Sequence, residues 1–321
     1  MDSALRRIRI AVSTGRLRGL PAEPGTPEIT LLGAGESYVA WRIGSGDQAQ
    51  VLRVPRRSPH EMPRSMTAEF ETLRRVPPEL GTSAIALETG TDNPLGIPYM
   101  VTTHVSGRAL RATDWNPRLA TALAHQIARL HEAFATSPAP SAVFVPSAGE
   151  QGEELLTWWG RHHPETLTDP RVTALLPAWR RELTRLAPAF EAVPIHPLIH
   201  GDVVVTNVIL GPDGVPRLID FEWSGPGDRA KDLALIGGRV IGGPWYLPMT
   251  PDDVAAFVTE YSRYSRHAGA IDPQQLLARR DAYELLDRMG NLLYCLSRPG
   301  EARYGMWADE IARNLTDRLA D

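Results

Sequence analysis

The amino-acid sequence predicts an α+β fold of two lobes, in which a small antiparallel sheet is followed by a larger helical lobe. Three observations lead to this prediction. The first hundred residues contain short runs of β-type residues separated by glycine and proline turns. From residue 116 onward, apolar residues recur at helical spacing. The length of 321 residues is enough for two lobes, each with its own interior.

The first lobe, assigned to residues 1–103, is expected to bind nucleotide and to hold one antiparallel sheet and one helix. The predicted strands are 29–32, 38–43, 50–54, 85–88 and 99–104. Met66, Phe70 and Leu73 recur at helical spacing between the third and fourth strands, until Pro77 and Pro78 end the segment.

The second lobe, assigned to residues 104–321, is expected to carry catalysis and substrate binding. Asn116, Thr250 and Asp272 each precede a proline, which is the pattern of an N-cap followed by proline at the first helical position. The predicted helices cover 117–134, lie near 151–163 and 171–191, start at 251 and 273, and end with one around 307–319.

The composition excludes several classes of protein. A net charge of −4 with 22% charged residues is typical of a globular protein that binds neither nucleic acid nor membrane. No apolar run reaches the ~18 residues that span a bilayer, and no signal sequence is recognised, so a cytoplasmic enzyme or binding protein is expected. The single cysteine, Cys295, lies in an apolar helical run and is expected to be a core residue.

A short β insertion at 197–221 interrupts the helices and brings polar residues together. Strands at 208–210 and 217–219 are expected to form a hairpin about the turn 212–214. Its ends place Asn207 beside Asp220, with Asp202 on the preceding loop. Each residue alone reads as a turn cap or a strand end, but the three around one hairpin favour a site. Asp220 and the Asn207 amide suit Mg2+, and Asp202 suits a base or a hydroxyl-positioning group.

These motifs resemble those of the aminoglycoside phosphotransferase family, a small-molecule branch of the protein-kinase-like fold. The similar segments are the catalytic loop His200-Gly201-Asp202 with Asn207, the metal-binding segment 219–221, and residues 227–234. The resemblance implies a bilobal kinase-like fold and an O-phosphotransferase that uses ATP or GTP with Mg2+. It also implies a small-molecule antibiotic as acceptor, of aminoglycoside, macrolide or nucleoside type, and a role for Asp232 in bracing the catalytic loop.

The nucleotide-binding side departs from the usual kinase pattern. Arg53 occupies the strand position at which kinases carry lysine. In having arginine there, the strand resembles that of macrolide phosphotransferases. The only lysine of the chain is Lys231. Arginine can bind phosphate bidentately. Its partner is expected to be Glu69, with Glu71 as the competitor. Lys231 is expected to pair with Asp228 or Asp232.

Main-chain groups are expected to complete the nucleotide site. The segment containing Gly33, Gly35 and Ser37 lies between two strands and could place N–H groups over phosphates, although an ordinary turn explains it equally well. Residues 98–107, including Thr102 and His104, resemble the hinge that contacts the base. Glu222 follows the metal-binding segment and could be an acid that supports the metal site, but it is expected to lie at the surface.

Other functions remain open at this point. The chain could be a metabolic kinase of choline, a sugar or an amino alcohol, or a nucleotide-binding pseudokinase. The nine histidines lack the context of a zinc site. Most tryptophans of the second lobe are expected in the core, while one or two could stack on a ring of the substrate.

Overall fold

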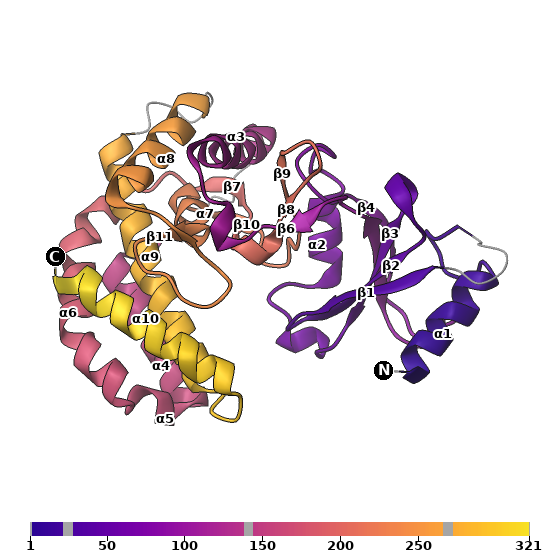
Figure 1. Ribbon diagram of the computed structural model, residues 1–321, viewed down its shortest axis with the longest axis horizontal. Coiled ribbons are helices and arrows are strands. Elements are labelled where there is room, and N and C mark those ends of the chain that lie inside the picture. Colours follow the sequence, from indigo (N-terminus) through magenta and orange to yellow (C-terminus); the bar gives the residue numbers. More distant parts are fainter. Residues whose placement is uncertain (1, 22–27, 138–143, 266–271, 321) are drawn as a thin grey trace. The chain divides into compact units, whose positions relative to one another are not determined.

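The computed structural model describes residues 2–21, 28–137, 144–265 and 272–320 and divides the chain into two units (Figure 1). The first unit comprises Met1–Arg108 with Ile209–Ser224, and the second comprises Ala109–Val208 with Gly225–Asp321. The chain therefore passes between the units three times.

A five-stranded antiparallel sheet forms the first unit, with the strand order β1-β2-β3-β5-β4. Each strand agrees with a predicted one to within two residues at either end: β1 (Ile29–Ala34), β2 (Tyr38–Ile43), β3 (Gln50–Pro55), β4 (Ala84–Glu88) and β5 (Tyr99–Thr103). In the β2–β3 register, Ala40 is opposite Arg53 and Trp41 is opposite Leu52. Because side chains alternate along a strand, Arg53 and Trp41 point to opposite faces of the sheet.

Helices cover both faces of this sheet. α2 (Met66–Leu73), which was predicted, lies on the Arg53 face and begins at the N-cap Ser65. α1 (Asp2–Ser13), which the sequence analysis did not predict, packs on the Trp41 face (Figure 1). There Ile8 and Val12 join a core with Trp41 and Leu52.

The hairpin of β8 (Val208–Leu210) and β9 (Pro216–Leu218) corrects the predicted division of the chain. It was assigned to the second lobe, but Ile209–Ser224 belong to the first unit. The cause is long-range hydrogen bonding, since the Leu218 N–H donates to the Leu80 carbonyl at 2.8 Å and the Thr82 N–H donates to the Leu218 carbonyl at 3.2 Å. Arg64 also donates to Ser224, to the carbonyl and, at 3.1 Å, to Oγ.

The second unit is mainly helical, as predicted. Asn116 accepts from two backbone amides at the start of the first long helix, and Thr250 and Asp253 form a capping box at another. The helices are α3 (Pro117–Phe134), α4 (Ala148–His162), α5 (Pro164–Leu167), α6 (Pro170–Leu186), α7 (Arg229–Leu235), α8 (Pro251–Tyr264), α9 (Pro273–Leu296) and α10 (Ala302–Ala320). The core includes Trp179 and Cys295, and burial raises the pKa of the Cys295 thiol to about 12.

Short strands complete the chain. They are β6 (Arg108–Ala109), β7 (His196–Ile199), β10 (Gly225–Gly227), β11 (Gly237–Gly238) and β12 (Leu247–Pro248). β7 pairs with β10 and so fixes the start of the loop that contains Asp202. Across the described part of the chain, no helix combines the length and apolarity needed to cross a membrane.

Candidate active site

In the first unit, Arg53 stands between two carboxylates. The side chain extends from β3, is 7% exposed, and donates to Glu69 of α2 and, at 2.6 Å, to Oδ1 of Asp220. Glu71, the competing partner, lies at the surface and pairs with Arg74 at 3.5 Å. Burial alone would lower the pKa of Arg53, but the charges of Glu69 and Asp220 raise it above its ordinary value. A permanent cation is therefore fixed at this position.

Tyr38 belongs to the same cluster and was missed by the sequence analysis. Its hydroxyl donates to Oε2 of Glu69 at 3.0 Å, and the Arg53 guanidinium lies 4.1 Å from the centre of its ring. Burial and the Glu69 charge raise the pKa of Tyr38. An aromatic residue at the start of a strand usually belongs to the core, so the sequence carries no signal for this role. The tyrosine holds both members of the ion pair in place.

The segment after β9 combines a strained backbone with a second carboxylate. Asp220 has φ of 65° and is the only non-glycine residue with positive φ in the described chain. Such left-handed conformations persist where the surrounding structure fixes them, often at functional sites. Glu222 is 8% exposed, which corrects its expected surface position. Its Oε2 has no hydrogen-bond partner among the described residues, and burial together with the Asp220 charge raises its pKa to about 7.

The glycine segment forms a closed turn. The Gly35 N–H donates to the Tyr38 carbonyl at 2.9 Å, and the Gly33 position pairs with Ala40 in the sheet. Arg56 donates to the Gly35 carbonyl at 2.5 Å, and Ser37 is buried. The Gly35 amide is therefore engaged in the turn in this conformation.

The two residues of the expected hinge have different environments. Thr102 is 1% exposed and lies within β5, opposite Val51 and Ala84 of the neighbouring strands. His104 follows the strand, and its N–H donates to the Ala49 carbonyl at 3.2 Å. Burial, with a smaller effect of Arg42, lowers the pKa of His104. The structure thus places Thr102 inside the sheet and His104 at its end.

In the second unit, Asp202 and Asn207 are hydrogen-bonded to each other. The Asn207 amide Nδ2 donates to Oδ2 of Asp202 at 2.7 Å and to its carbonyl at 3.0 Å. The Asn207 Oδ1 accepts no hydrogen bond from the described residues. The intervening Val203 and Val205 are buried and anchor the loop in the core. Asp202 is therefore held in a fixed orientation, and an amide oxygen remains available as a hard ligand.

Asp232 of α7 holds the backbone of this loop by hydrogen bonds. It is fully buried and accepts from the N–H groups of His200 at 2.7 Å and Gly201 at 2.8 Å, and its Oδ2 lies 3.0 Å from Nε2 of His131. Burial alone would raise the pKa of Asp232, but its hydrogen bond and charge interaction with His131, together with His200, hold it below the ordinary value. The carboxylate thus fixes the backbone immediately before Asp202.

The expected partnership of Lys231 is wrong. Asp228 pairs instead with Arg279 at 2.7 Å, and Asp232 is engaged by His131 and by the His200 backbone. Neighbouring residues of a helix point in different directions, so Lys231 cannot share the environment of Asp232.

An acidic and aromatic network not anticipated from the sequence adjoins the Asp202 loop. The Trp245 carbonyl accepts from the Val205 N–H at 2.8 Å, and the next residue, Tyr246, donates to Asp287 of α9 at 2.7 Å. Burial raises the pKa of Tyr246, and the charges of Asp287 and Asp202 add to this effect. The electrostatic coupling of Tyr246 to Asp202 places the network near the candidate base.

Lowering the pH from 6.5 to 4 is expected to destabilise the protein through His196. Burial and the neighbouring His131 lower the pKa of His196 from 6.5 to about 4. The buried neutral ring therefore contributes stability above pH 6.5, and this contribution is lost as the pH falls towards 4. Its full size is on the order of 3 kcal/mol. Urea unfolding at pH 7 and pH 5 should show that the free energy of unfolding falls less on acidification for His196→Asn than for the wild type. Equal losses would assign the acid sensitivity to other groups.

Among the described residues, no group of three or more His, Cys, Asp or Glu side chains could hold a metal ion. Mg2+ often takes only one or two protein ligands, with phosphate and water completing its shell. The carboxylate of Asp220 and the Oδ1 of Asn207, each placed within its own unit, are of the type that Mg2+ prefers.

Residues 28–277 match the model of the "Phosphotransferase enzyme family". Viomycin phosphotransferase of Streptomyces vinaceus is 30% identical over 204 residues, which cover 56% of this chain and 67% of that protein. The family match includes the Asp202 loop.

Solved structures of similar fold span nearly the whole chain. The GDP and kanamycin complex of APH(2")-IIia has a TM-score of 0.63 at 18% identity and covers 97% of this chain and 98% of that one. Choline kinase LicA from Streptococcus pneumoniae has a TM-score of 0.63 at 15% identity, with 99% of each chain covered. These likenesses establish a kinase-like fold, as expected from the sequence.

Proposed function

Because this chain belongs to the phosphotransferase enzyme family, a family of small-molecule kinases with a hydroxyl acceptor, we propose that it phosphorylates a hydroxyl-bearing antibiotic. ATP or GTP is the proposed donor, with Mg2+ as the metal. The observation that carries the proposal is the Asp202–Asn207 pair, held in place by Asp232. Phosphoryl transfer needs little from a protein beyond such positioning and the neutralisation of phosphate charge.

Each proposed role follows from the placement of a residue. Asp202 orients the acceptor hydroxyl and takes its proton. Arg53, held by Glu69 and Tyr38, supplies fixed positive charge to the donor phosphates. Asp220 and Asn207 would hold Mg2+, which neutralises phosphate charge when bound. Gly33, Gly35, Ser37, Thr102 and His104 remain proposed nucleotide contacts.

Asp220→Asn is expected to weaken Mg2+-nucleotide binding because it removes the anionic oxygen that a hard cation prefers. Titration with Mg2+ at fixed nucleotide concentration should show a requirement raised roughly tenfold or more, as for loss of one charged ligand. Asp213→Asn, at an exposed hairpin turn, is the matched control. An unchanged Mg2+ requirement for Asp220→Asn would move the metal site elsewhere, with Glu222 as the next candidate.

The proposed acceptor is a cationic antibiotic. Acidic residues outnumber basic ones from residue 199 onward, and Asp202 adds negative charge near Tyr246, whereas Asp287 is paired with Arg288 at 2.7 Å. A nucleotide-consumption screen would compare viomycin, kanamycin, hygromycin B, a macrolide and a nucleoside antibiotic. Phosphorylation of one of them, with the phosphate located by mass spectrometry, supports the proposal. Loss of antibacterial activity on phosphorylation would establish resistance as the outcome.

A metabolic kinase of choline or an amino alcohol is the second candidate. The choline kinase structures of similar fold motivate it, together with a ring of aromatic contacts in the second unit. There Trp245 contacts Tyr294 and Trp307 edge-on, at centroid distances of 6.2 and 5.1 Å. Turnover of choline without turnover of any antibiotic would favour this candidate. Nucleotide binding without turnover of any acceptor would favour a pseudokinase.

A further inference from the structure

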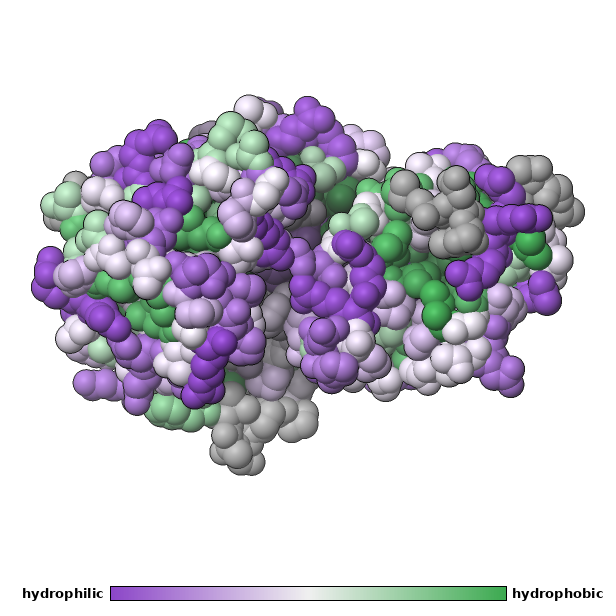
Figure 2. All heavy atoms as spheres, turned by 90° about the horizontal axis from the view of Figure 1, so that it is seen from below, coloured by the Kyte–Doolittle hydropathy of each residue, from purple (hydrophilic) through white to green (hydrophobic). Residues whose placement is uncertain are grey.

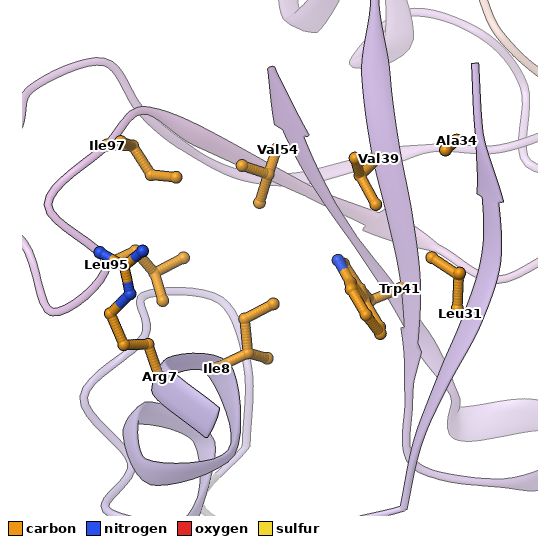
Figure 3. Close-up of a pocket in the computed structure, with 9 residues that line it drawn as sticks. All are labelled: Arg7, Ile8, Leu31, Ala34, Val39, Trp41, Val54, Leu95 and Ile97. Atoms are coloured by element: carbon orange, nitrogen blue, oxygen red, sulfur yellow. The ribbon is translucent and has the colours of Figure 1, made fainter. Parts of the chain in front are cut away.

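An apolar cavity lies in the first unit, on the face of the sheet opposite Arg53. Its volume is about 170 Å³, and its walls come from α1, from β1 to β3 and from the loop before β5 (Figure 3). The main contributors are Ile8, Leu31, Val39, Trp41, Val54 and Ile97. Because Val39 and Val54 are opposite each other and alternate with Ala40 and Arg53, the cavity is separated from the Arg53 cluster by the sheet itself.

The cavity is open to a ligand from solvent. α1 fills the neighbouring part of this face with Ile8 and Val12, and among the described residues none covers the β1 side. Leu31 is 39% exposed and Ile97 is 38% exposed at this edge. Figure 2 shows hydrophobic residues gathered on the visible surface of the unit that holds the sheet. An engineered apolar cavity of about 150 Å³ is known to bind benzene, so the space here suits one aromatic ring.

The lining of the cavity is almost wholly apolar, and one cationic side chain stands at its edge. Arg7 lies on its wall beside Leu95, and its guanidinium has no ion-pair partner among the described residues (Figure 3). Trp41 is 5% exposed, and its indole N–H has no acceptor in the described chain. Figure 3 shows the indole nitrogen on the side of Val39 and Val54. A ligand with an apolar ring inside the cavity and an anionic group at its edge would match both the walls and Arg7.

We propose that this cavity binds small aromatic carboxylates, with the ring against Trp41 and the carboxylate at Arg7. The charge of Arg7 selects an acid over a neutral compound of the same shape. Leu31 and Ala34 flank Gly33 in β1, so an occupant contacts the strand that carries the glycine segment. The site is distinct from the proposed active site and does not depend on the proposed function.

The test is fluorine NMR on the full chain, with para-fluorophenylacetate as the probe and para-fluorophenethyl alcohol as its neutral counterpart. We expect saturable line broadening for both, with the acid binding about tenfold more tightly, as for one charge-assisted hydrogen bond. Arg7→Ala should abolish this preference. Arg6→Ala removes a neighbouring exposed charge of the same helix and should leave the preference unchanged.

A second variant tests whether the probes bind in the cavity or elsewhere on the protein. Ala34→Phe places a ring in the cavity from the exposed edge strand and should abolish binding of both probes, while circular dichroism and thermal unfolding report on the fold. Where that variant does not fold, Val54→Leu replaces it, and the two probes should again lose affinity. No saturable broadening, or broadening that survives filling of the cavity, would overturn the proposal. So would a dimer in light scattering that Ala34→Phe dissociates, since a second copy would then be the occupant.

Discussion

Asp202→Ala is expected to lower turnover about 10²–10⁴-fold with the true acceptor, the range found for groups that position or deprotonate a reacting hydroxyl. Nucleotide affinity and stability should change little. The Asn207 amide keeps its second acceptor, the carbonyl of residue 202, at 3.0 Å, and Asp232 still holds the backbone of His200 and Gly201. Steady-state kinetics should therefore show a fall in kcat, while calorimetry shows an unchanged nucleotide Kd.

Two further variants isolate the role of the carboxylate. Asp202→Asn keeps the size of the side chain and should lose nearly as much activity as Asp202→Ala, because the amide cannot accept the proton. Asp213→Ala removes an exposed carboxylate from the hairpin turn and should leave turnover unchanged. A fall of less than tenfold for Asp202→Ala would refute the assignment of Asp202 as the base or positioning group.

The elements of the fold that the sequence predicts well are those whose signals are local. A run of β-type residues bounded by glycine segments predicted β2 at its observed bounds, and the Asn116-Pro117 pair predicted the first residue of α3. α1 was missed because its apolar residues are buried only by packing on Trp41 and the other residues of that sheet face, which are distant in sequence. The Ile209–Ser224 segment was misassigned for a similar reason. Its partners, Leu80 and Thr82, lie more than a hundred residues away in sequence, and no local pattern indicates them.

The candidate site shows the same limit. Motif spacing and family resemblance made Asp202, Asn207 and Asp220 candidates, and the position in β3 made Arg53 one. The inward orientation of Glu222 could not be predicted, because the positive φ of Asp220 breaks the strand alternation on which such a prediction would depend. Tyr38 and Asp287 were missed because their roles come from contacts with α2 and with Tyr246, which the sequence does not specify.

Arg53→Ala is expected to impair both stability and nucleotide use. The substitution leaves Glu69, which is 0% exposed, without its cation, and removal of one partner from a buried ion pair typically costs about 3–5 kcal/mol. Loss of the fixed charge should also raise the nucleotide Kd and lower kcat. Arg53→Lys should recover part of both, since a point charge binds phosphate but cannot donate to Glu69 and Asp220 as a planar fork does. Urea unfolding and nucleotide titration measure the two effects separately.

The double mutant with Glu69→Ala tests whether the pair acts as a unit. Once Arg53 is absent, removing Glu69 also removes the unpaired buried charge, so the combined loss of stability should be smaller than the sum of the single losses. Glu71→Ala, on the same helix but exposed and paired with Arg74, should be neutral alone and additive with Arg53→Ala. Additive losses for Glu69→Ala and Arg53→Ala would show that the pair is not coupled. Full activity in both single variants would mean that the glycine segment and the main chain hold the nucleotide without the arginine.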